Sequence, residues 1–454
     1  MQKNMTTGSP FRLISGFVLP IFFGNIFQQL YLMSDTLIVS RLLGVEALAA
    51  VGSVSPFSYM VVGAAQGLTM GFTAILSQRF GAGDNKGMRK VYAMSTLLSV
   101  VISFLLSIIF VFLARPMLEM VNTPSNIIDM AVEYISIIYI FLIFQVLYNL
   151  YAGVLRSLGD SKSPLIFMIV SAVLNIILDI VAIAVFRMGV GGAALATVFS
   201  QGISALLSFI YIKKKFTILK PSKEEMKYDK SLSKVLLKVG LPGAFQYSIT
   251  AVSCILVQAS LNNFGSDSVA AYSVANKIEN MVSQFYPALG IGISTFAGQN
   301  LGAGELKRVR KGFRVSVYMN IAYSILALIV CRYLAEPMTN IFVDRSTSSP
   351  VVIEQSVLYV TTMSYFFIPL GMIFIFRTGC QGLGSGKIPM LSAIIELIAR
   401  SLTAFSLPMF FGFFGICLSN AVSWMSAGFT LPVVYLAFMR KLEKSHSELL
   451  KNLS

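Results

Sequence analysis

The sequence predicts an all-α polytopic membrane protein of twelve transmembrane helices, in two pseudo-symmetric six-helix lobes with both termini in the cytoplasm. Apolar residues make up 56% of the 454 residues and charged residues 12%, against roughly a quarter charged in soluble proteins. Apolar runs of about 18 or more residues recur along the chain, each long enough to cross about 30 Å of hydrocarbon. Blocks of sequence also return after about 220 residues, which indicates two copies of one unit.

The spans follow from the apolar runs, since a helix satisfies its own backbone polar groups inside a bilayer. Residues 1–10 are polar and precede a long apolar run, so we expect the first run to be a retained span rather than a signal peptide. The predicted spans are 11–38, 46–77, 91–114, 131–155, 163–187, 191–212, 235–263, 268–299, 312–333, 351–378, 388–410 and 415–439.

The net charge of +15 follows the loops. Most of the 35 lysines and arginines lie before the first span, in the loops that follow even-numbered spans, and after the last span; the stretch from Lys213 to Lys238 is the densest. By the positive-inside rule this face is cytoplasmic. The basic residues therefore indicate topology and attraction to anionic lipid rather than binding to nucleic acid.

The internal repeat divides the chain. Leu19-Pro20 returns as Leu241-Pro242, and Gly81–Asp84 corresponds to Gly302–Glu305. The basic residues behind that turn also return: Lys86, Arg89 and Lys90 match Lys307, Arg310 and Lys311. The predicted parts are an N-terminal lobe (1–215), a basic inter-lobe loop (216–232), a C-terminal lobe (233–439) and a cytoplasmic tail (440–454).

Two copies of six spans have the same orientation, so the binding site is expected between them near the midplane. Pro20 and Pro242 each lie about a third of the way into the first span of their copy. A proline inside a helix frees a carbonyl and bends the helix. Each proline is therefore either a hinge or a static kink.

Ionisable residues within hydrocarbon indicate function by default. Lys277 and Glu279 lie in the eighth span, and Glu396 and Arg400 lie in the eleventh. Glu396 and Arg400 are four residues apart, the spacing of an ion pair within one helix. These four residues either have such structural partners or line a substrate cavity, and we place no other base within the spans.

Asp35 and Asp179 have no basic partner within the spans of their half. Asn175 lies one turn before Asp179 on the same helical face, and Thr197 of the sixth span supplies a hydroxyl. Carboxylate and amide oxygens suit a hard monovalent cation, and a buried carboxylate can hold a proton. We therefore predict a cation site from these residues.

The chain resembles the multidrug and toxic compound extrusion (MATE) transporters over nearly its whole length. The motifs that carry the resemblance are Pro20…Asp35, Gln78…Gly81-Ala82-Gly83, Arg156–Asp160 and Asn175…Asp179. The resemblance implies a V-shaped pair of lobes and export of organic, often cationic, compounds driven by inward flow of H⁺ or Na⁺.

In that family the cation site of the N-terminal lobe uses an aspartate of span one, an Asn–Asp pair of span five and a threonine of span six, which Asp35, Asn175, Asp179 and Thr197 match. Some members also use acids of spans seven and ten. This chain has Gln246, Thr250 and Gln258 in span seven, so coupling is expected to rest on the N-terminal lobe.

The expected function is secondary active antiport of small organic, cationic or multidrug-type compounds against H⁺ or Na⁺, without a cofactor or resident metal. The alternatives are a flippase of lipid-linked saccharides and a dedicated metabolite exporter. The Gly382–Lys387 segment lacks P-loop spacing, and no catalytic cluster supports an enzyme. We expect a monomer in a bacterial inner membrane, with small molecules and the bilayer as its partners.

Overall fold

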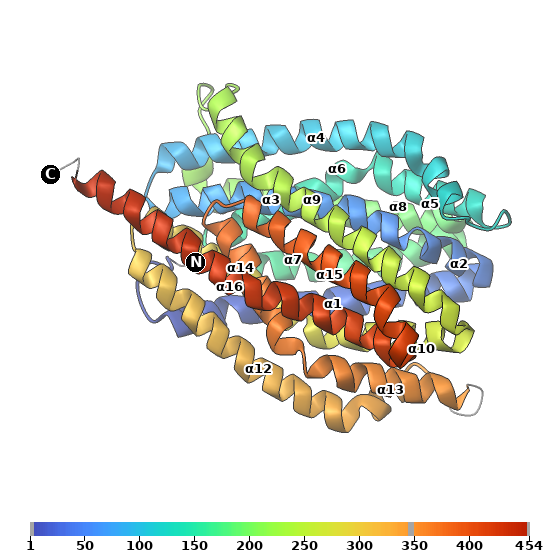
Figure 1. Ribbon diagram of the computed structural model, residues 1–454. Helices are drawn as coiled ribbons and strands as arrows, with labels where there is room; N and C mark the ends of the chain where they lie inside the picture. The colour runs from blue at the N-terminus through green and yellow to red at the C-terminus, as the bar shows by residue number, and fades with distance from the viewer. Residues whose placement is uncertain (1–3, 344–348, 452–454) are drawn as a thin grey trace. The chain divides into compact units, whose positions relative to one another are not determined.

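The computed structural model describes residues 4–343 and 349–451, apart from the side chains of 445–447 and 449–451. Within these ranges the regular structure is entirely helical (Figure 1). The first half comprises α1 (Pro10–Leu43), α2 (Val45–Ser53), α3 (Ser55–Gly81), α4 (Asn85–Met120), α5 (Ile128–Ile140), α6 (Leu142–Ser157), α7 (Lys162–Ile180), the π-helical turn η1 (Val181–Val185), α8 (Gly189–Lys215) and the 3₁₀ turn η2 (Thr217–Leu219).

The second half follows the same plan. It comprises α9 (Lys230–Leu261), the 3₁₀ turn η3 (Asn262–Phe264), α10 (Ser266–Ser283), α11 (Phe285–Gly302), α12 (Leu306–Asn340), α13 (Pro350–Ser364), α14 (Phe367–Gly382), α15 (Lys387–Phe411) and α16 (Phe413–Lys451). The expected tail from 440 continues α16 as a helix to Lys451, and its last three residues lie outside the described ranges.

Membrane-spanning character is evident from length, hydropathy and surface. Among the described residues nine helices are long and apolar enough to cross a membrane, and two bent helix pairs raise the number to eleven. The remaining predicted span, 268–299, is divided between α10 and α11. Large apolar side chains lie on the outside, with Phe112 of α4 79% exposed and Met409 of α15 82% exposed. Such a surface requires a hydrocarbon solvent.

The two bent pairs occupy equivalent places in the repeat. Helices α5 and α6 meet at Phe141 with a bend of 48°, and α13 and α14 meet near Phe366 with a bend of 55°. Phe141 and Phe366 are 225 residues apart, close to the spacing of about 220 residues between the two copies. The break in the fourth span is therefore a property of the repeated fold, and neither junction contains a proline.

The helices group into two compact units, and α1 and α9 each contribute to both. Unit 1 contains Leu19–Ser248, and unit 2 contains Thr6–Val18 and Ile249–Ser454 as far as it is described. Within α1 the chain passes from unit 2 to unit 1 after Val18, next to Pro20. Within α9 it passes from unit 1 to unit 2 after Ser248, six residues beyond Pro242. The expected loop at 216–232 lies inside unit 1, so the units differ from the expected lobes in these two helix segments.

Close helix contacts through glycine explain where the first part of α9 belongs. Within unit 1, Gly67 and Gly71 of α3 face Gly243 and Gly240 of α9, and a Cβ on either α3 glycine would fall on the α9 backbone. Small residues one turn apart allow membrane helices to approach this closely. Within unit 2, Gly292 of α11 lies against the start of α1, where a Cβ would meet the Val18 side chain.

Candidate cation site

Three helices of unit 1 bring the predicted cation-site residues together. Asp35 lies on α1, Asn175 and Asp179 lie one turn apart on α7, and Thr197 lies on α8. The π-helical turn η1 begins two residues after Asp179. Such turns occur often at functional sites, because they re-aim the residues beside them.

The two carboxyl groups are buried and face each other. Asp35 is 7% exposed and Asp179 is fully buried. The two groups lie close enough for their charges to interact. Two ionised carboxylates repel one another, because neither can donate a hydrogen bond. A proton or another cation between them would relieve that repulsion.

Asn175 connects the pair to α8. In the amide orientation that satisfies both ends, its nitrogen donates to Asp179 Oδ2 at 2.8 Å and its oxygen accepts from the Thr197 backbone N–H at 3.1 Å. Asn175 is fully buried. The amide thus fixes the position of one Asp179 oxygen and leaves the other free to act.

Two buried oxygen atoms of the site are unsatisfied. In the described part of the chain, Oδ1 of Asp35 and Oδ1 of Asp179 have no hydrogen-bond partner. Buried acceptors without partners are rare in proteins and costly. A proton or a Na⁺ ion would satisfy both, and the site offers only oxygen ligands, which suit hard cations. No cluster of three or more His, Cys, Asp or Glu that could hold a metal ion occurs among the described residues.

Two tyrosines complete the site and were missed from the sequence. The hydroxyls of Tyr31 on α1 and Tyr134 on α5 both lie near the Thr197 side chain. Tyr31 lies one turn before Asp35, so helical spacing could have indicated it. Tyr134 has no such signal, because its place depends on how α5 packs against α8.

The four charged residues expected in the second half do not form one group. Lys277 is exposed, with its ammonium 5.9 Å from the centre of the Phe342 ring. Glu279 accepts a hydrogen bond of 2.8 Å from the Tyr359 hydroxyl, which in turn accepts from Asn420 at 3.1 Å. Glu279 is thus held in a polar network between α10, α13 and α16.

Of the two alternatives for Glu396 and Arg400, an ion pair with each other is not what the structure shows. Glu396 pairs with Arg377 of α14, with Oε1 at 3.2 Å from Nη1, and also accepts from Ser392 at 3.0 Å. Arg400 donates instead to Ser253 Oγ of α9 at 2.8 Å. Contact with neighbouring helices thus overrides helical spacing. Arg377 is 8% exposed and lies inside the tenth span, so the expectation of only two bases within the spans is wrong.

Both predicted hinge prolines lie inside continuous helices, Pro20 in α1 and Pro242 in α9. Each is close to the point where its helix passes from one compact unit to the other.

A helical membrane protein built from two repeated halves, with a buried carboxylate pair, has the architecture of a secondary transporter. The MatE family model matches residues 20–181 and 242–406, one match in each half. The chain therefore belongs to the MatE family of membrane transporters, and several of its relatives are named multidrug resistance proteins.

Curated relatives cover most of the chain. A probable multidrug resistance protein of Bacillus subtilis, YoeA, is 29% identical over 80% of this chain and 80% of its own length. A second from the same organism, YpnP, is 32% identical over 67% of this chain and 68% of its own length. An FAD transporter of Shewanella oneidensis is 26% identical over 85% of this chain and 84% of its own length.

Solved structures show the same fold. A MATE in complex with MaL6 superposes with a TM-score of 0.90 at 20% identity, covering 97% of this chain and 99% of the other. An outward-facing multidrug resistance MATE transporter also superposes with a TM-score of 0.90. It is 21% identical, and the match covers 97% of this chain and 98% of the other. The chain is thus a multi-pass membrane protein with the fold of these transporters, and the relatives named above are bacterial.

Proposed function

We propose that this protein is an antiporter that exports small organic cations in exchange for H⁺ or Na⁺ bound between Asp35 and Asp179. The buried carboxylate pair with its two unsatisfied oxygens carries the proposal. Loading one cation removes a buried negative charge, and emptying the site restores it. A charge that moves through about 100 mV contributes roughly 2.3 kcal/mol, which is enough to bias such a cycle.

In this proposal the cation acts on α1. Asp35 and Pro20 lie on the same helix, so neutralising Asp35 changes the packing of α1 and its bend at Pro20. The altered helix narrows the adjacent substrate space and releases the exported compound. The protein works as a monomer in the inner membrane, with no cofactor beyond the coupling ion.

The test uses purified protein in liposomes and measures efflux of ethidium under a pH gradient and, separately, a Na⁺ gradient. Wild type should export under one of them, which identifies the coupling ion. Asp35→Asn should lose the ethidium efflux that depends on the gradient. Asp129→Asn, an acid on the exposed start of α5, is the matched control and should keep it. Full ion-coupled export by Asp35→Asn would refute the proposal.

A second candidate is a dedicated exporter of a metabolite, which two observations favour. One relative is named an FAD transporter, and Arg400 in the second half is a buried base that bonds to the neutral Ser253 hydroxyl. Buried bases suit anionic compounds. Transport of flavin nucleotides without transport of ethidium in the same liposomes would support this candidate. Selective movement of a lipid-linked saccharide would instead indicate the flippase.

A further inference from the structure

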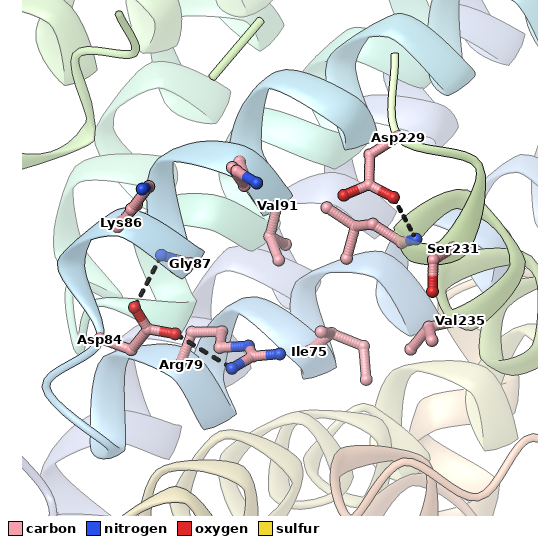
Figure 2. A pocket seen from close by; sticks show the side chains of 11 residues that line it. Ile75, Arg79, Asp84, Lys86, Gly87, Val91, Asp229, Ser231 and Val235 are labelled. Carbon is pink, nitrogen blue, oxygen red and sulfur yellow. Dashed lines mark hydrogen bonds and ion pairs between the residues drawn. The ribbon is translucent and has the colours of Figure 1, made fainter. Parts of the chain in front are cut away.

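A pocket of about 370 Å³ lies within unit 1, between the α3–α4 turn and the start of α9 (Figure 2). Its charged lining residues are three bases and two acids: Arg79, Lys86, Lys90, Asp84 and Asp229. Apolar side chains of α3, α4 and α9 complete the lining. The pocket is therefore amphipathic, with one positive charge in excess.

Each of the two acids accepts a hydrogen bond from a backbone N–H at the start of the helix that follows it. Asp84 accepts from the Gly87 N–H at 2.8 Å and pairs with Arg79 at 3.0 Å (Figure 2). Asp229 accepts from the Leu232 N–H at 3.0 Å. These contacts cap the N-termini of α4 and α9, which are the positive ends of the helix dipoles.

The remaining positive charge is uncompensated. Lys86 and Lys90 lie one turn apart on α4, and within the described ranges neither has a hydrogen bond or an ion pair. Two ammonium groups and two helix N-termini thus converge on one pocket. That combination attracts an anion.

The equivalent junction in the second half holds an arginine side chain. An offset of 221 pairs Gly87 with Arg308 and Arg79 with Asn300. In unit 2, Arg308 donates to Asn300 Oδ1 at 2.9 Å and to the carbonyl of Gly8, before α1, at 3.1 Å. A guanidinium thus fills the junction between the turn and the incoming helix.

In unit 1 the corresponding residue has no side chain. A Cβ at Gly87 would run into the Asp84 carboxylate. Glycine therefore permits the Asp84 cap and leaves the junction with α9 open. The same turn is closed by protein atoms in one half and is a basic pocket in the other.

We propose that this pocket binds a phosphate group, carried by an anionic phospholipid or by a soluble phosphate compound. Lys86 and Lys90 would contact the phosphate oxygens, and the Ser231 hydroxyl at the pocket edge could donate to them. The apolar part of the lining suits the glycerol and first acyl carbons of a lipid. Bound phosphate would join α4 to the start of α9. The pocket is separate from the Asp35–Asp179 site, so the proposal is independent of the transport mechanism.

The experiment is native mass spectrometry of the full-length protein in detergent with phosphatidylglycerol or phosphatidylcholine. Wild type should retain phosphatidylglycerol preferentially. Lys86→Gln/Lys90→Gln should reduce that preference by about tenfold or more, since each lysine near a membrane surface attracts anionic lipid measurably. Lys307→Gln/Lys311→Gln removes the same charge at the equivalent positions of the repeat and should leave the preference unchanged.

Competition distinguishes the two sources of phosphate. Displacement of the lipid by millimolar glycerol 3-phosphate, or direct retention of glycerol 3-phosphate, would indicate a soluble ligand; lipid retained throughout would indicate a lipid site. Lys86→Arg/Lys90→Arg should restore binding, because it keeps the charge. Equal loss in both glutamine pairs, or unchanged lipid preference in the Lys86/Lys90 pair, would overturn the proposal.

Discussion

At the scale of single residues, Asn175 determines how much of Asp179 is available to a cation. Its amide donates to one oxygen of that carboxylate and accepts from the Thr197 backbone on α8. A hydrogen bond to a charged group contributes roughly 1.5–3 kcal/mol. Because that bond stabilises the ionised form of Asp179, Asn175→Ala should strengthen binding of a coupling proton by about tenfold or more. The measurement is the H⁺ or Na⁺ concentration that gives half-maximal transport, with the exposed Asn126→Ala as control. An unchanged value would show that Asn175 only supports packing.

The buried pair of Arg377 and Glu396 supports a prediction about stability. Both side chains are less than a tenth exposed, and the Arg377 Nε is unsatisfied among the described residues. Removing one partner of a buried pair leaves the other charge uncompensated, at about 3–5 kcal/mol. Glu396→Gln should therefore lower the thermal unfolding temperature strongly.

The double variant Arg377→Met/Glu396→Leu should recover most of that loss, because apolar residues of similar size replace buried pairs at little cost. Thermal unfolding in detergent compares the three proteins. A double variant as unstable as Glu396→Gln would show that the pair stabilises the fold beyond compensating its own charges.

Only some of the residues described above could be assigned to the candidate site, or to a partner, from the sequence. Asp35, Asn175 and Asp179 could be identified because they are polar, lack bases in the spans of their half, and share helical spacing. Tyr134 and Arg377 could not be placed correctly, because their roles depend on contacts between helices distant in sequence. The alternative of an ion pair between Glu396 and Arg400 is not what the structure shows, for the same reason: spacing within one helix does not show which neighbouring helix offers a better partner.

At the scale of helices, the contact between α3 and α9 depends on glycine. Gly67→Val should force the two backbones apart, at a cost of about 1–3 kcal/mol for overpacking. The expected result is a lower unfolding temperature and reduced transport. Gly52→Val on α2 is the control, since a Cβ there meets nothing within 4 Å. Equal effects of the two substitutions would argue against a specific contact.

The loop before α9 is held to α4 by a two-pronged ion pair. Arg89 Nε and Nη2 each lie 2.8 Å from an oxygen of Glu225, and the Ser222 N–H donates to the same carboxylate at 2.8 Å. The hydrogen bonds from Arg89 and then from Ser222 lower the pKa of Glu225 to about 2. A carboxyl whose pKa is lowered by folding stabilises the fold above its unfolded pKa of roughly 4.3 and loses that effect as pH falls toward 2.

Hydrogen exchange of the loop amides, corrected for the intrinsic pH dependence, should therefore show constant protection from neutral pH to about 5 and a decline below about 4. At neutral pH, Glu225→Gln should already remove protection of the loop. Glu224→Gln, at the exposed neighbouring position, should have no effect. Protection that persists in Glu225→Gln would show that the buried apolar residues of the loop hold it alone.

At the scale of the whole molecule, composition and the repeat were enough to predict twelve helices in two copies. The spans are determined by the length of each apolar run and by the need of the backbone polar groups to bond within the helix. Both properties can be read directly from the sequence. The passage of α1 and α9 between the compact units was not predictable. The repeat makes the two halves look self-contained, and only glycine contacts such as Gly67 with Gly243 show where the first part of α9 packs.

We expect the two halves to have different roles in transport, because their buried charged residues have different hydrogen-bond surroundings. The first half has the Asp35–Asp179 pair with unsatisfied oxygens, whereas Glu279 in the second half already has the Tyr359 hydroxyl as a partner. We therefore expect Asp35→Asn to abolish gradient-driven export while substrate still binds. Glu279→Gln should keep export coupled to the gradient and change the apparent affinity for cationic substrates, by about threefold to tenfold for one charge in a partly buried site. Substrate binding and ion-driven accumulation would be measured separately in the same liposomes for both variants. Loss of accumulation in Glu279→Gln with unchanged substrate binding would place ion coupling in the second half as well.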